Sequence, residues 1–475
     1  MFHLEDHKLN IAVITDRGER LSYEELGATA NSFANAIPQK GLLFCLCENR
    51  IGSFVGYVAC IEHHNPIVLL DGGKEANTIH NLINIYQPEY VWVNAEKSEG
   101  YIGEKVYEYA SFVLLKMQYE VEVEVEVEKP EINPELALCL TTSGSTGSPK
   151  FVRLSAKNVL ANAESIAEYL EIDENERPVT TLPSYYSYGV SVINSHLIKG
   201  ATVLLTEGTV AQREFWNFMK EYKATSIAGV PYTYEMLKML RFFRMDLPYL
   251  KTMTQAGGKL NKDIAKEYIE FAQSKGKRFF VMYGQTEATA RMSYLPLEHA
   301  LDKYASIGIA IPRGKFSLID VKGKVIDEPD VDGELIYEGP NVSLGYAECR
   351  TDLAKGDENH GVLHTGDVAR RDADGYYYIT GRMKRFVKVW GNRCNLDATE
   401  QLVKAITTSC ACVGVDDKIT IFVTQEGLEE EIIKLLVAKT GFNNRAFAVK
   451  VIDAIPVKSS GKIDYQVMQA MIENK

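Results

Sequence analysis

Two kinds of hydrophobic pattern alternate along most of this chain. Short apolar runs typical of buried strands include LALCL (136–140), ATVLL (201–205), ATSIAGVP (224–231) and RFFVMYG (278–284). Between them lie stretches whose apolar residues recur every three or four positions, as they do on one face of a helix. In one such stretch Ser155 is a predicted helix cap, and the apolar face that follows consists of Val159, Leu160, Ala163, Ile166, Ala167 and Leu170. The alternation predicts an α/β fold.

The pattern changes near residue 381. Before it, the segments 333–340 and 364–381 are rich in turn residues and in β-forming residues. After it, the chain predicts a small separate unit with strands at 386–391, 419–423 and 448–453 and helices around 399–406 and 428–439. We therefore predict a large N-terminal domain of packed β-sheets with flanking helices over residues 1–381, and a small C-terminal α+β domain over residues 382–475. We place the hinge near Lys384.

Composition narrows the class of protein. The chain has 475 residues, of which 46% are hydrophobic, and this suffices for a large core and more than one domain. A net charge of -12 argues against general affinity for nucleic acid or for an anionic membrane. The sequence contains neither a long apolar run nor a basic segment followed by an apolar one near residue 1, so we expect no membrane span, no signal peptide and a cytoplasmic protein. The 8 cysteines form no CxxC pair, which favours buried strand thiols over a metal site.

The segment TTSGSTGSPK between Thr141 and Lys150 is the most informative motif. Its glycines let the backbone come close to a ligand, its hydroxyls and N–H groups donate hydrogen bonds, and its lysine adds positive charge. Such a loop can wrap a polyphosphate, although taken alone it could equally be a flexible turn. It is not a Walker A loop, because the glycines are too close together and the lysine stands too far beyond them. The candidate phosphate-binding residues are Thr141, Thr142, Ser143, Gly144, Ser145, Thr146, Gly147 and Lys150.

Six further motifs follow this loop. They are AGGKL (256–260), YGQTE (283–287), GEL with later glycines (333–346), HTGD (364–367), GR with a lysine at 388 (381–388) and PVKSSGK (456–462). In order and spacing, the set resembles the acyl-adenylate-forming enzymes, a family that includes acyl-CoA synthetases, peptide-synthetase adenylation domains and beetle luciferases. The resemblance implies that the chain is a ligase that joins a carboxylate to the α-phosphate of ATP, expels pyrophosphate and then passes the acyl group to a thiol.

The resemblance also implies roles for individual residues. A hard carboxylate oxygen suits Mg²⁺, so Glu287 is the candidate metal ligand, and Thr286 beside it is the candidate partner of the α-phosphate. The aspartate of HTGD, Asp367, can accept hydrogen bonds from both ribose hydroxyls. The other residues that the resemblance assigns to the nucleotide are Gly257, Gly258, Lys259, Tyr283, Gly284, Arg382 and Lys388.

The lysine of the SSGK segment, Lys462, is the candidate catalytic residue. A cation on a mobile small-residue loop can bridge the substrate carboxylate and the α-phosphate, and it can screen their repulsion. In the family the small C-terminal domain rotates between two half-reactions. Lys384 occupies the hinge position, and Lys388 matches the lysine that approaches the nucleotide in the second arrangement.

Departures from the family pattern bear on the acid. Gly189 stands where peptide-synthetase domains carry an aspartate that pairs with the α-ammonium of an amino acid. Burying that ammonium without a partner is costly, so an ordinary α-amino acid is disfavoured. Tyr185, Tyr186 and Tyr188 form a phenolic segment that suits an aromatic, hydroxylated or short acid, or that merely packs in the core.

The acceptor stays open between coenzyme A and the phosphopantetheine of a discrete acyl-carrier protein. No carrier segment follows Lys475, so we expect a separate acceptor molecule. The acceptor-side loop also departs from the family, since Ala398 replaces the first of two usual glutamates and only Glu400 matches. Two alternatives remain at this point: an adenylate-forming enzyme with a non-thiol acceptor, and a nucleotide-binding module without catalysis. The sequence does not identify the acid, the pathway or the oligomeric state.

Overall fold

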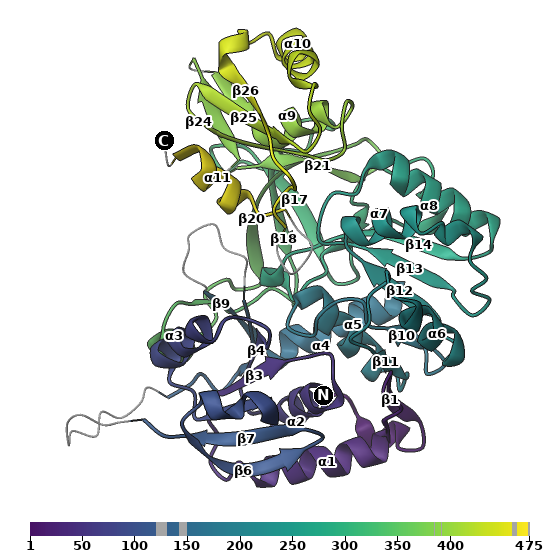
Figure 1. The fold of residues 1–475 in the computed structure, drawn as a ribbon, viewed down its shortest axis with the longest axis vertical. Helices are drawn as coiled ribbons and strands as arrows, with labels where there is room; N and C mark the ends of the chain where they lie inside the picture. Colours follow the sequence, from purple (N-terminus) through teal and green to yellow (C-terminus); the bar gives the residue numbers. More distant parts are fainter. Residues whose placement is uncertain (120–130, 142–149, 384, 391, 458–462, 474–475) are drawn as a thin grey trace. The chain divides into compact units, whose positions relative to one another are not determined.

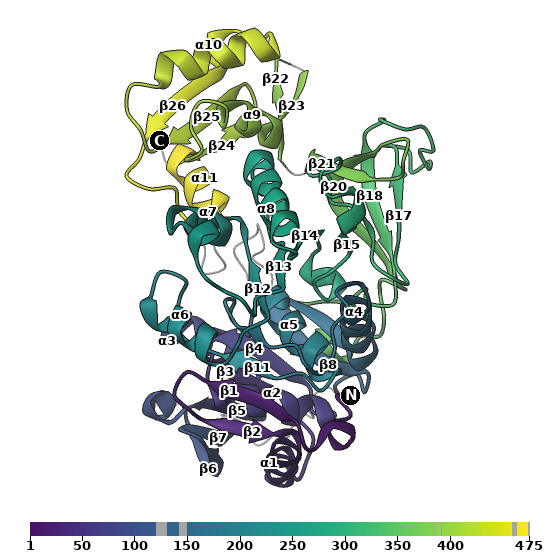
Figure 2. The same ribbon diagram turned by 90° about the vertical axis from the view of Figure 1, so that its right-hand side faces the viewer.

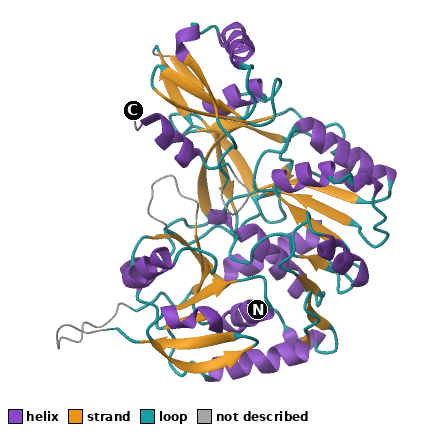
Figure 3. Cartoon of the chain, viewed as in Figure 1, coloured by secondary structure: helices purple, strands orange, loops and turns teal. Residues whose placement is uncertain are grey.

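A computed structural model describes residues 1–119, 131–141, 150–383, 385–390, 392–457 and 463–473. The predicted α/β class is confirmed, because strands and helices alternate along much of the chain, and Figure 3 shows both kinds of element throughout the described residues. Contacts divide the chain into two compact units. Unit 1 comprises residues 1–304, 310–315 and 338–363, and unit 2 comprises residues 305–309, 316–337 and 364–475. The hinge near Lys384 and the domain limits 1–381 and 382–475 remain predictions.

A nine-stranded sheet forms the larger half of unit 1 (Figure 1). Its strands, in spatial order, are β16 (Ile309–Ala310), β15 (Ser293–Tyr294), β14 (Arg278–Tyr283), β13 (Thr252–Gln255), β12 (Ser226–Gly229), β10 (Pro178–Val179), β11 (Val203–Leu205), β1 (Ile11–Thr15) and β2 (Arg20–Ser22). From β14 to β1 every neighbouring pair is parallel. The carboxyl ends of these strands therefore lie along one edge of the sheet.

An eight-stranded sheet forms the other half of unit 1. Its order is β19 (Gly345–Ala347), β9 (Phe151–Ser155), β8 (Leu136–Thr141), β4 (Ile67–Asp71), β3 (Leu43–Cys47), β5 (Tyr90–Asn94), β7 (Phe112–Met117) and β6 (Gly103–Tyr109). The central strands β8, β4, β3 and β5 are parallel, and antiparallel strands flank them on both sides. The strand that leads into the glycine loop thus lies inside a sheet, as its apolar sequence indicates.

Helices join and cover the two sheets of unit 1. They are α1 (Tyr23–Asn35), α2 (Ile51–Glu62), α3 (Ala76–Tyr86), α4 (Ala156–Tyr169), α5 (Ser187–Leu197), α6 (Arg213–Glu221), α7 (Pro231–Met239) and α8 (Lys262–Ser274). The cap at Ser155 is confirmed: its side chain accepts from the backbone of Asn158, whose side chain accepts in return from the Ser155 N–H. Every residue of α5 is buried, and so is every residue of α2 except the last, Glu62. One apolar core takes side chains from α2, α5 and both sheets, so these two helices are core elements.

Three smaller sheets belong to unit 2. The first has the order β17 (Lys315–Ile319), β18 (Gly333–Glu338), β20 (Val362–Arg371) and β21 (Tyr377–Arg382), and the second pairs β22 (Phe386–Val389) with β23 (Asn392–Asn395). The third has the order β24 (Cys410–Val415), β25 (Lys418–Val423) and β26 (Phe447–Val451), with α9 (Leu396–Val403), α10 (Glu429–Thr440) and α11 (Tyr465–Glu473) around it (Figure 2). Helices α9 and α10 pack on one face of this sheet and α11 on the other. The predicted elements of this region are present, although α9 begins three residues earlier than the pattern suggests.

The 8 cysteines are all free, and every one except Cys349 is buried, which confirms the interpretation as interior thiols. None of the described helices combines the length and the apolar character that crossing a membrane requires.

Candidate active site

The motif residues of unit 1 gather where parallel strands end. β10 leads into residues 180–186, β12 into Pro231, β13 into residues 256–258 and β14 into residues 284–287. Because β10, β12, β13 and β14 are adjacent and parallel, these four loops leave the same edge of the sheet. Ligand sites of α/β proteins lie at this edge.

The turn after β14 is tightly constrained. A Cβ at Gly284 would lie 1.5 Å from the carbonyl oxygen of Ala290, so only glycine fits. Thr289 and Ala290 have positive φ angles of 56° and 96°, which L-residues rarely adopt. Asn341 holds the turn, because its Nδ2 donates to the carbonyl of Ala288 at 2.7 Å and its own carbonyl accepts from Thr289 Oγ1 at 2.7 Å. Strain of this kind persists where the surroundings over-determine it, which is typical of functional sites.

Glu287 lies on this turn, in a short 3-10 segment (Thr286–Ala288). Tyr346 of β19 donates its hydroxyl proton to Glu287 Oε1 at 2.7 Å. The ammonium of Lys150 lies 3.6 Å from the centroid of the Tyr346 ring. Burial raises the pKa of Tyr346, and the Glu287 carboxylate raises it further, so the phenol stays a donor. Tyr346 therefore joins the end of the glycine loop to the carboxylate of the YGQTE motif.

The donor set fits Mg²⁺. Glu287 is half-buried, and Oε2 receives no hydrogen bond from the described residues. Among the residues that the structure describes, no three His, Cys, Asp or Glu side chains are grouped closely enough to hold a metal by themselves. Mg²⁺ is commonly bound by one or two carboxylates together with waters and phosphate oxygens, so a single carboxylate beside a phosphate loop suits it.

The remaining predicted residues of the glycine loop lie at the limits of the described chain. Thr141 ends β8 and pairs with Phe151 of β9, and Lys150 precedes β9 directly. Thr142, Ser143, Gly144, Ser145, Thr146 and Gly147, the hinge residue Lys384 and the catalytic candidate Lys462 lie outside the described residues.

Thr286 has a partner that the motif alone does not indicate. Its Oγ1 lies 3.0 Å from Oγ of Ser187, the first residue of α5. The start of α5 thus lies against the candidate phosphate-binding threonine, and the tyrosines around it lie near the same site.

These tyrosines differ in their surroundings. Tyr188 is buried, and its hydroxyl donates to the carbonyl of Thr254 at 2.8 Å. Burial raises the pKa of Tyr188 to about 12 and has the same effect on Tyr186, so both are neutral phenols. Tyr185 packs against the main apolar core as a partly buried side chain. Pocket lining remains a prediction for all three, and for Tyr188 the structure shows a core contact.

Gly189 has a clear steric reason. A Cβ at this position would lie 2.1 Å from the carbonyl oxygen of Pro183. The close backbone packing leaves no room for any side chain at this position. It therefore explains why no carboxylate stands here.

The glycines after β13 also adopt a special geometry. Gly257 has a φ of +84°, and a Cβ at Gly258 would lie 3.1 Å from Pro231 Cγ. The buried Gln255 side chain donates to the carbonyl of Gly258 at 2.9 Å. Tyr283 ends β14, and its hydroxyl accepts from Gln285 Nε2 at 3.2 Å. The side chain of Lys259, next to Gly258, is exposed.

In unit 2, two predicted residues face each other on one β-ladder. Asp367 of β20 and Arg382 of β21 are cross-strand partners, and Arg382 Nε donates to Asp367 Oδ1 at 3.0 Å. Asp367 is 2% exposed, whereas the Arg382 side chain is mostly exposed. Lys388 lies on β22 with its side chain exposed.

The carboxylate of Glu400 is buried among polar partners of the C-terminal region. It contacts Lys404, Arg385 and the Tyr465 hydroxyl at 3.1, 3.4 and 3.0 Å. These contacts hold α9 to α11. The structure therefore gives Glu400 a role in packing within the C-terminal region.

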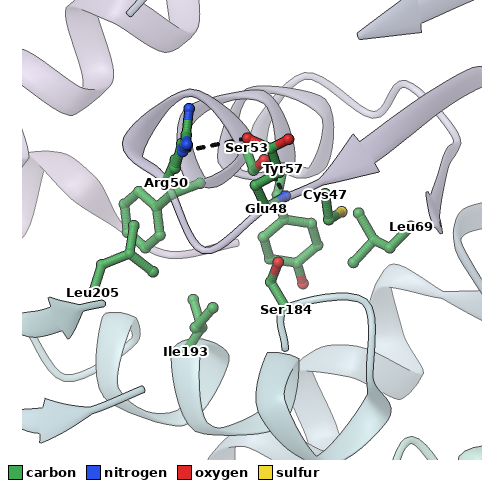
Figure 4. Close-up of a pocket in the computed structure, with 10 residues that line it drawn as sticks. Cys47, Glu48, Arg50, Ser53, Tyr57, Leu69, Ser184, Ile193 and Leu205 are labelled. Atoms are coloured by element: carbon green, nitrogen blue, oxygen red, sulfur yellow. Dashed lines mark hydrogen bonds and ion pairs between the residues drawn. The ribbon is translucent and has the colours of Figure 1, made fainter. Parts of the chain in front are cut away.

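One small cavity lies beside the start of α2 (Figure 4). Its volume is about 10 Å³, which is too small for a substrate. Figure 4 shows Glu48 and Arg50 on one side and Ser184 and Ile193 on the other.

Sequence reasoning did not assign three residues of this region. Ser187 lies in the tyrosine segment 185–188 and Tyr346 ends the motif 333–346. Their positions within these segments could therefore have identified both as candidate site residues. Arg291, a buried cation beyond the YGQTE motif, gave a weaker signal: one charged residue in the apolar context ATARMSYL.

The geometry and the fold together define a class, the adenylate-forming ligases, and comparison with known proteins agrees. The family model "AMP-binding enzyme" matches residues 3–347, and the chain belongs to this family.

Among curated relatives, oxalate–CoA ligase from Arabidopsis thaliana is 29% identical over 351 residues, which are 70% of this chain and 66% of that protein. Feruloyl-CoA synthase from an Amycolatopsis species is 26% identical over 345 residues, 69% of this chain and 68% of that protein. The match to the first of these spans just under two thirds of its length. A solved structure of o-succinylbenzoate CoA synthetase from Bacillus subtilis with its acyl-adenylate intermediate superposes with a TM-score of 0.76 at 21% identity, covering 97% of this chain and 96% of that one. This structural similarity, at 21% identity, shows that the two proteins share a fold.

Proposed function

We propose that this chain activates a small carboxylic acid with ATP and then transfers the acyl group to a thiol. In the first step a carboxylate oxygen attacks the α-phosphorus, the bond to the bridging oxygen breaks, and pyrophosphate leaves. In the second step a thiolate attacks the acyl carbon and AMP leaves. The acceptor is coenzyme A or the phosphopantetheine of a discrete carrier protein. Relatives named as CoA ligases and a neighbour that holds an acyl adenylate support this proposal.

The observation that carries the proposal is the chain of contacts from Lys150 through Tyr346 to Glu287. It joins a phosphate-type loop to a carboxylate at the carboxyl edge of a parallel sheet. Both reactants are anions, so the site needs positive charge and fixed donors where charge accumulates. Mg²⁺, when bound, neutralises phosphate oxygens, and Glu287 is the residue that would hold it. Thr286 is then the hydroxyl donor to the α-phosphate.

The remaining roles are assigned by motif. Asp367 binds the ribose hydroxyls, Arg382 lies beside it, and Tyr283 and the glycines after β13 accommodate the adenine. Lys462 bridges the two reacting anions in the first step, and Lys388 serves the second arrangement. Since Gly189 leaves no room for a side chain, a free α-ammonium finds no carboxylate there, and α-amino acids are disfavoured.

Pyrophosphate–ATP exchange over a panel of aromatic, short-chain, long-chain and amino acids tests this function. We expect exchange with at least one non-amino acid, followed by thioester formation when coenzyme A or a carrier is added. Glu287→Gln should lower the exchange rate at least ~10²-fold, because it removes a preorganised electrostatic group. Tyr346→Phe keeps the ring under Lys150 but removes the donor to Glu287, so we expect a loss of roughly tenfold and a higher apparent KM for Mg²⁺.

Each failure has its own meaning. ATP binding without exchange for any acid would indicate a nucleotide-binding module without catalysis. Exchange without a thioester, with product formed on an amine, would replace the thiol acceptor. Full exchange by Glu287→Gln would reject the assignment of the carboxylate.

A further inference from the structure

Arg291 is a buried cation without a charged partner. The residue is 1% exposed, although arginine is almost never fully buried unless paired. Its Nη1 donates to the Tyr169 hydroxyl at 3.2 Å and contacts Met282 Sδ at 2.7 Å, and its Nε has no hydrogen-bond partner. No carboxylate of the described residues forms an ion pair with it. A buried charge left in this state is expensive, so the site is built to receive an anion.

The backbone around Arg291 holds the side chain in place. Its carbonyl accepts from Asn162 Nδ2 at 2.9 Å and from Asn341 Nδ2 at 3.0 Å. It directly follows the strained pair Thr289 and Ala290. The guanidinium carbon lies 4.2 Å from the centroid of the Tyr188 ring. The backbone of Arg291 is therefore held by α4 and the segment before β19, and its guanidinium contacts Tyr188 of α5.

Arg291 lines an interior cavity of about 20 Å³ between α4, α5 and the nine-stranded sheet. Two other charged side chains line this cavity, and both are paired. Glu176 accepts from Thr225 Oγ1 and contacts Lys251 Nζ at 3.4 Å. Arg278 lies 2.9 Å from Glu171. Among the described residues of the lining, Arg291 is thus the charge without a counter-charge.

His196, which lines the same cavity, adds no charge near neutral pH. Burial lowers its pKa to about 4. Its Nδ1 lies 2.8 Å from the Val192 carbonyl, which only accepts, so Nδ1 carries the proton and Nε2 is an acceptor. His196 therefore adds no second positive charge beside Arg291.

The cavity and the proposed reaction centre are joined by α5. Its first residue, Ser187, contacts Thr286, its second, Tyr188, lies under the Arg291 guanidinium, and its later residues Val192, Ser195 and His196 line the cavity. Thr286 and Arg291 also belong to the same turn after β14. Consecutive residues of α5 therefore contact Thr286 and Arg291.

We infer that the substrate carries a second carboxylate at its distal end and that Arg291 binds it. This inference rests on the proposed acid activation and specifies its substrate class as a short dicarboxylic acid. The cavity volume of about 20 Å³ is little more than one water requires, so it admits only a compact group such as a carboxylate, and only if the lining side chains move apart. A planar guanidinium matches a carboxylate in shape and hydrogen bonding.

The test compares ligands that differ only at the distal group. Pyrophosphate–ATP exchange is measured for aliphatic diacids of increasing length, for each corresponding half-amide and for the monocarboxylic acid of equal length. We expect kcat/KM for the best diacid to exceed that of its half-amide by at least ~10²-fold, because a site built around a charged donor rejects the uncharged analogue. This comparison requires no variant, so a folding defect does not affect it.

Variants provide the second arm. Arg291→Met should lower the ratio of kcat/KM for the diacid to that for its half-amide to about one, and Arg291→Lys should restore part of this ratio. Arg278→Gln, which removes the paired arginine of the same cavity, should leave the ratio of diacid to half-amide unchanged.

Two results separate this inference from the proposed function. If wild-type protein shows no exchange with any acid, the proposed function fails. If monocarboxylic acids or half-amides react as well as diacids, or if Arg291→Met keeps the diacid preference, Arg291 is a packing residue and this inference is overturned while acid activation stands.

Discussion

Charged and neutral side chains lie next to each other in the interior beside α5, and their protonation states have different causes. His196 is neutral near pH 7 because burial lowers its pKa to about 4, whereas the buried Arg291 carries a guanidinium, a permanently charged group in proteins. The phenols of Tyr186 and Tyr188 stay protonated for the same reason as His196 stays neutral. In the described interior beside α5, the guanidinium of Arg291 is therefore charged while His196 and the two phenols are neutral near pH 7.

His196 makes a pH-dependent contribution to stability. The unfolded chain binds a proton at this residue below about pH 6.5, whereas the folded protein resists protonation down to about pH 4. Between these values the unfolded state holds more protons, so stability falls as the pH is lowered. We expect this residue to remove roughly 2 kcal/mol of unfolding free energy between pH 7 and pH 5.

Urea unfolding at both pH values measures this contribution. His196→Gln should show a smaller decrease between pH 7 and pH 5 than wild-type protein, and His64→Gln, at an exposed position, should match wild type. An equal decrease in His196→Gln and wild type would contradict the prediction.

How far single residues could be predicted depended on the specificity of their motif. Glu287 was proposed from YGQTE, since the type and order of those residues are restrictive. Arg291 could not be proposed, because a lone arginine in an apolar segment is compatible with a strand end at the surface. Its burial depends on Tyr188, Met282 and Tyr169, which come from three different elements.

At the scale of elements, the sequence pattern predicted the helix cap and the strands that depend only on neighbouring residues. The cap at Ser155 and the strands after it required only neighbouring residues. The order of strands in the two large sheets did not follow from the pattern, because β19 and β1 pair with strands far away in the chain. For the same reason the contact between Tyr346 and Glu287 became visible only in the structure.

The close packing at the start of α5 predicts opposite effects of the same substitution in two helices. Gly189→Ala places a Cβ 2.1 Å from the Pro183 carbonyl oxygen, so we expect a loss of about 2–4 kcal/mol of stability. Gly27→Ala in α1 places its Cβ 3.9 Å from the nearest side-chain atom, Leu4 Cδ1, and should gain roughly 0.5–1 kcal/mol through helix propensity. Denaturant midpoints of the two variants test both signs, and a neutral Gly189→Ala would show that α5 can shift.

At the scale of the whole molecule, the prediction concerns the hinge at Lys384, which lies outside the described residues. Proline fixes φ, so Lys384→Pro should block the rearrangement that the second half-reaction requires. We expect thioester formation to fall at least tenfold more than pyrophosphate exchange, whereas Lys384→Ala should retain both activities. Separate assays of the two half-reactions on the same preparation decide this, and a parallel loss of both would count against a hinge at this residue.

After residue 304 the chain passes between the two units several times, and its last return to unit 1 comprises residues 338–363. The returning stretch supplies Asn341, which holds the strained turn, and Tyr346, which orients Glu287. During synthesis the ribosome therefore releases the carboxylate long before its supports, and unit 1 cannot complete its interior until most of the protein has been translated. A gene fragment that ends between residues 295 and 345 would encode both strands that pair with β14, yet it would lack Tyr346, the hydroxyl donor to Glu287.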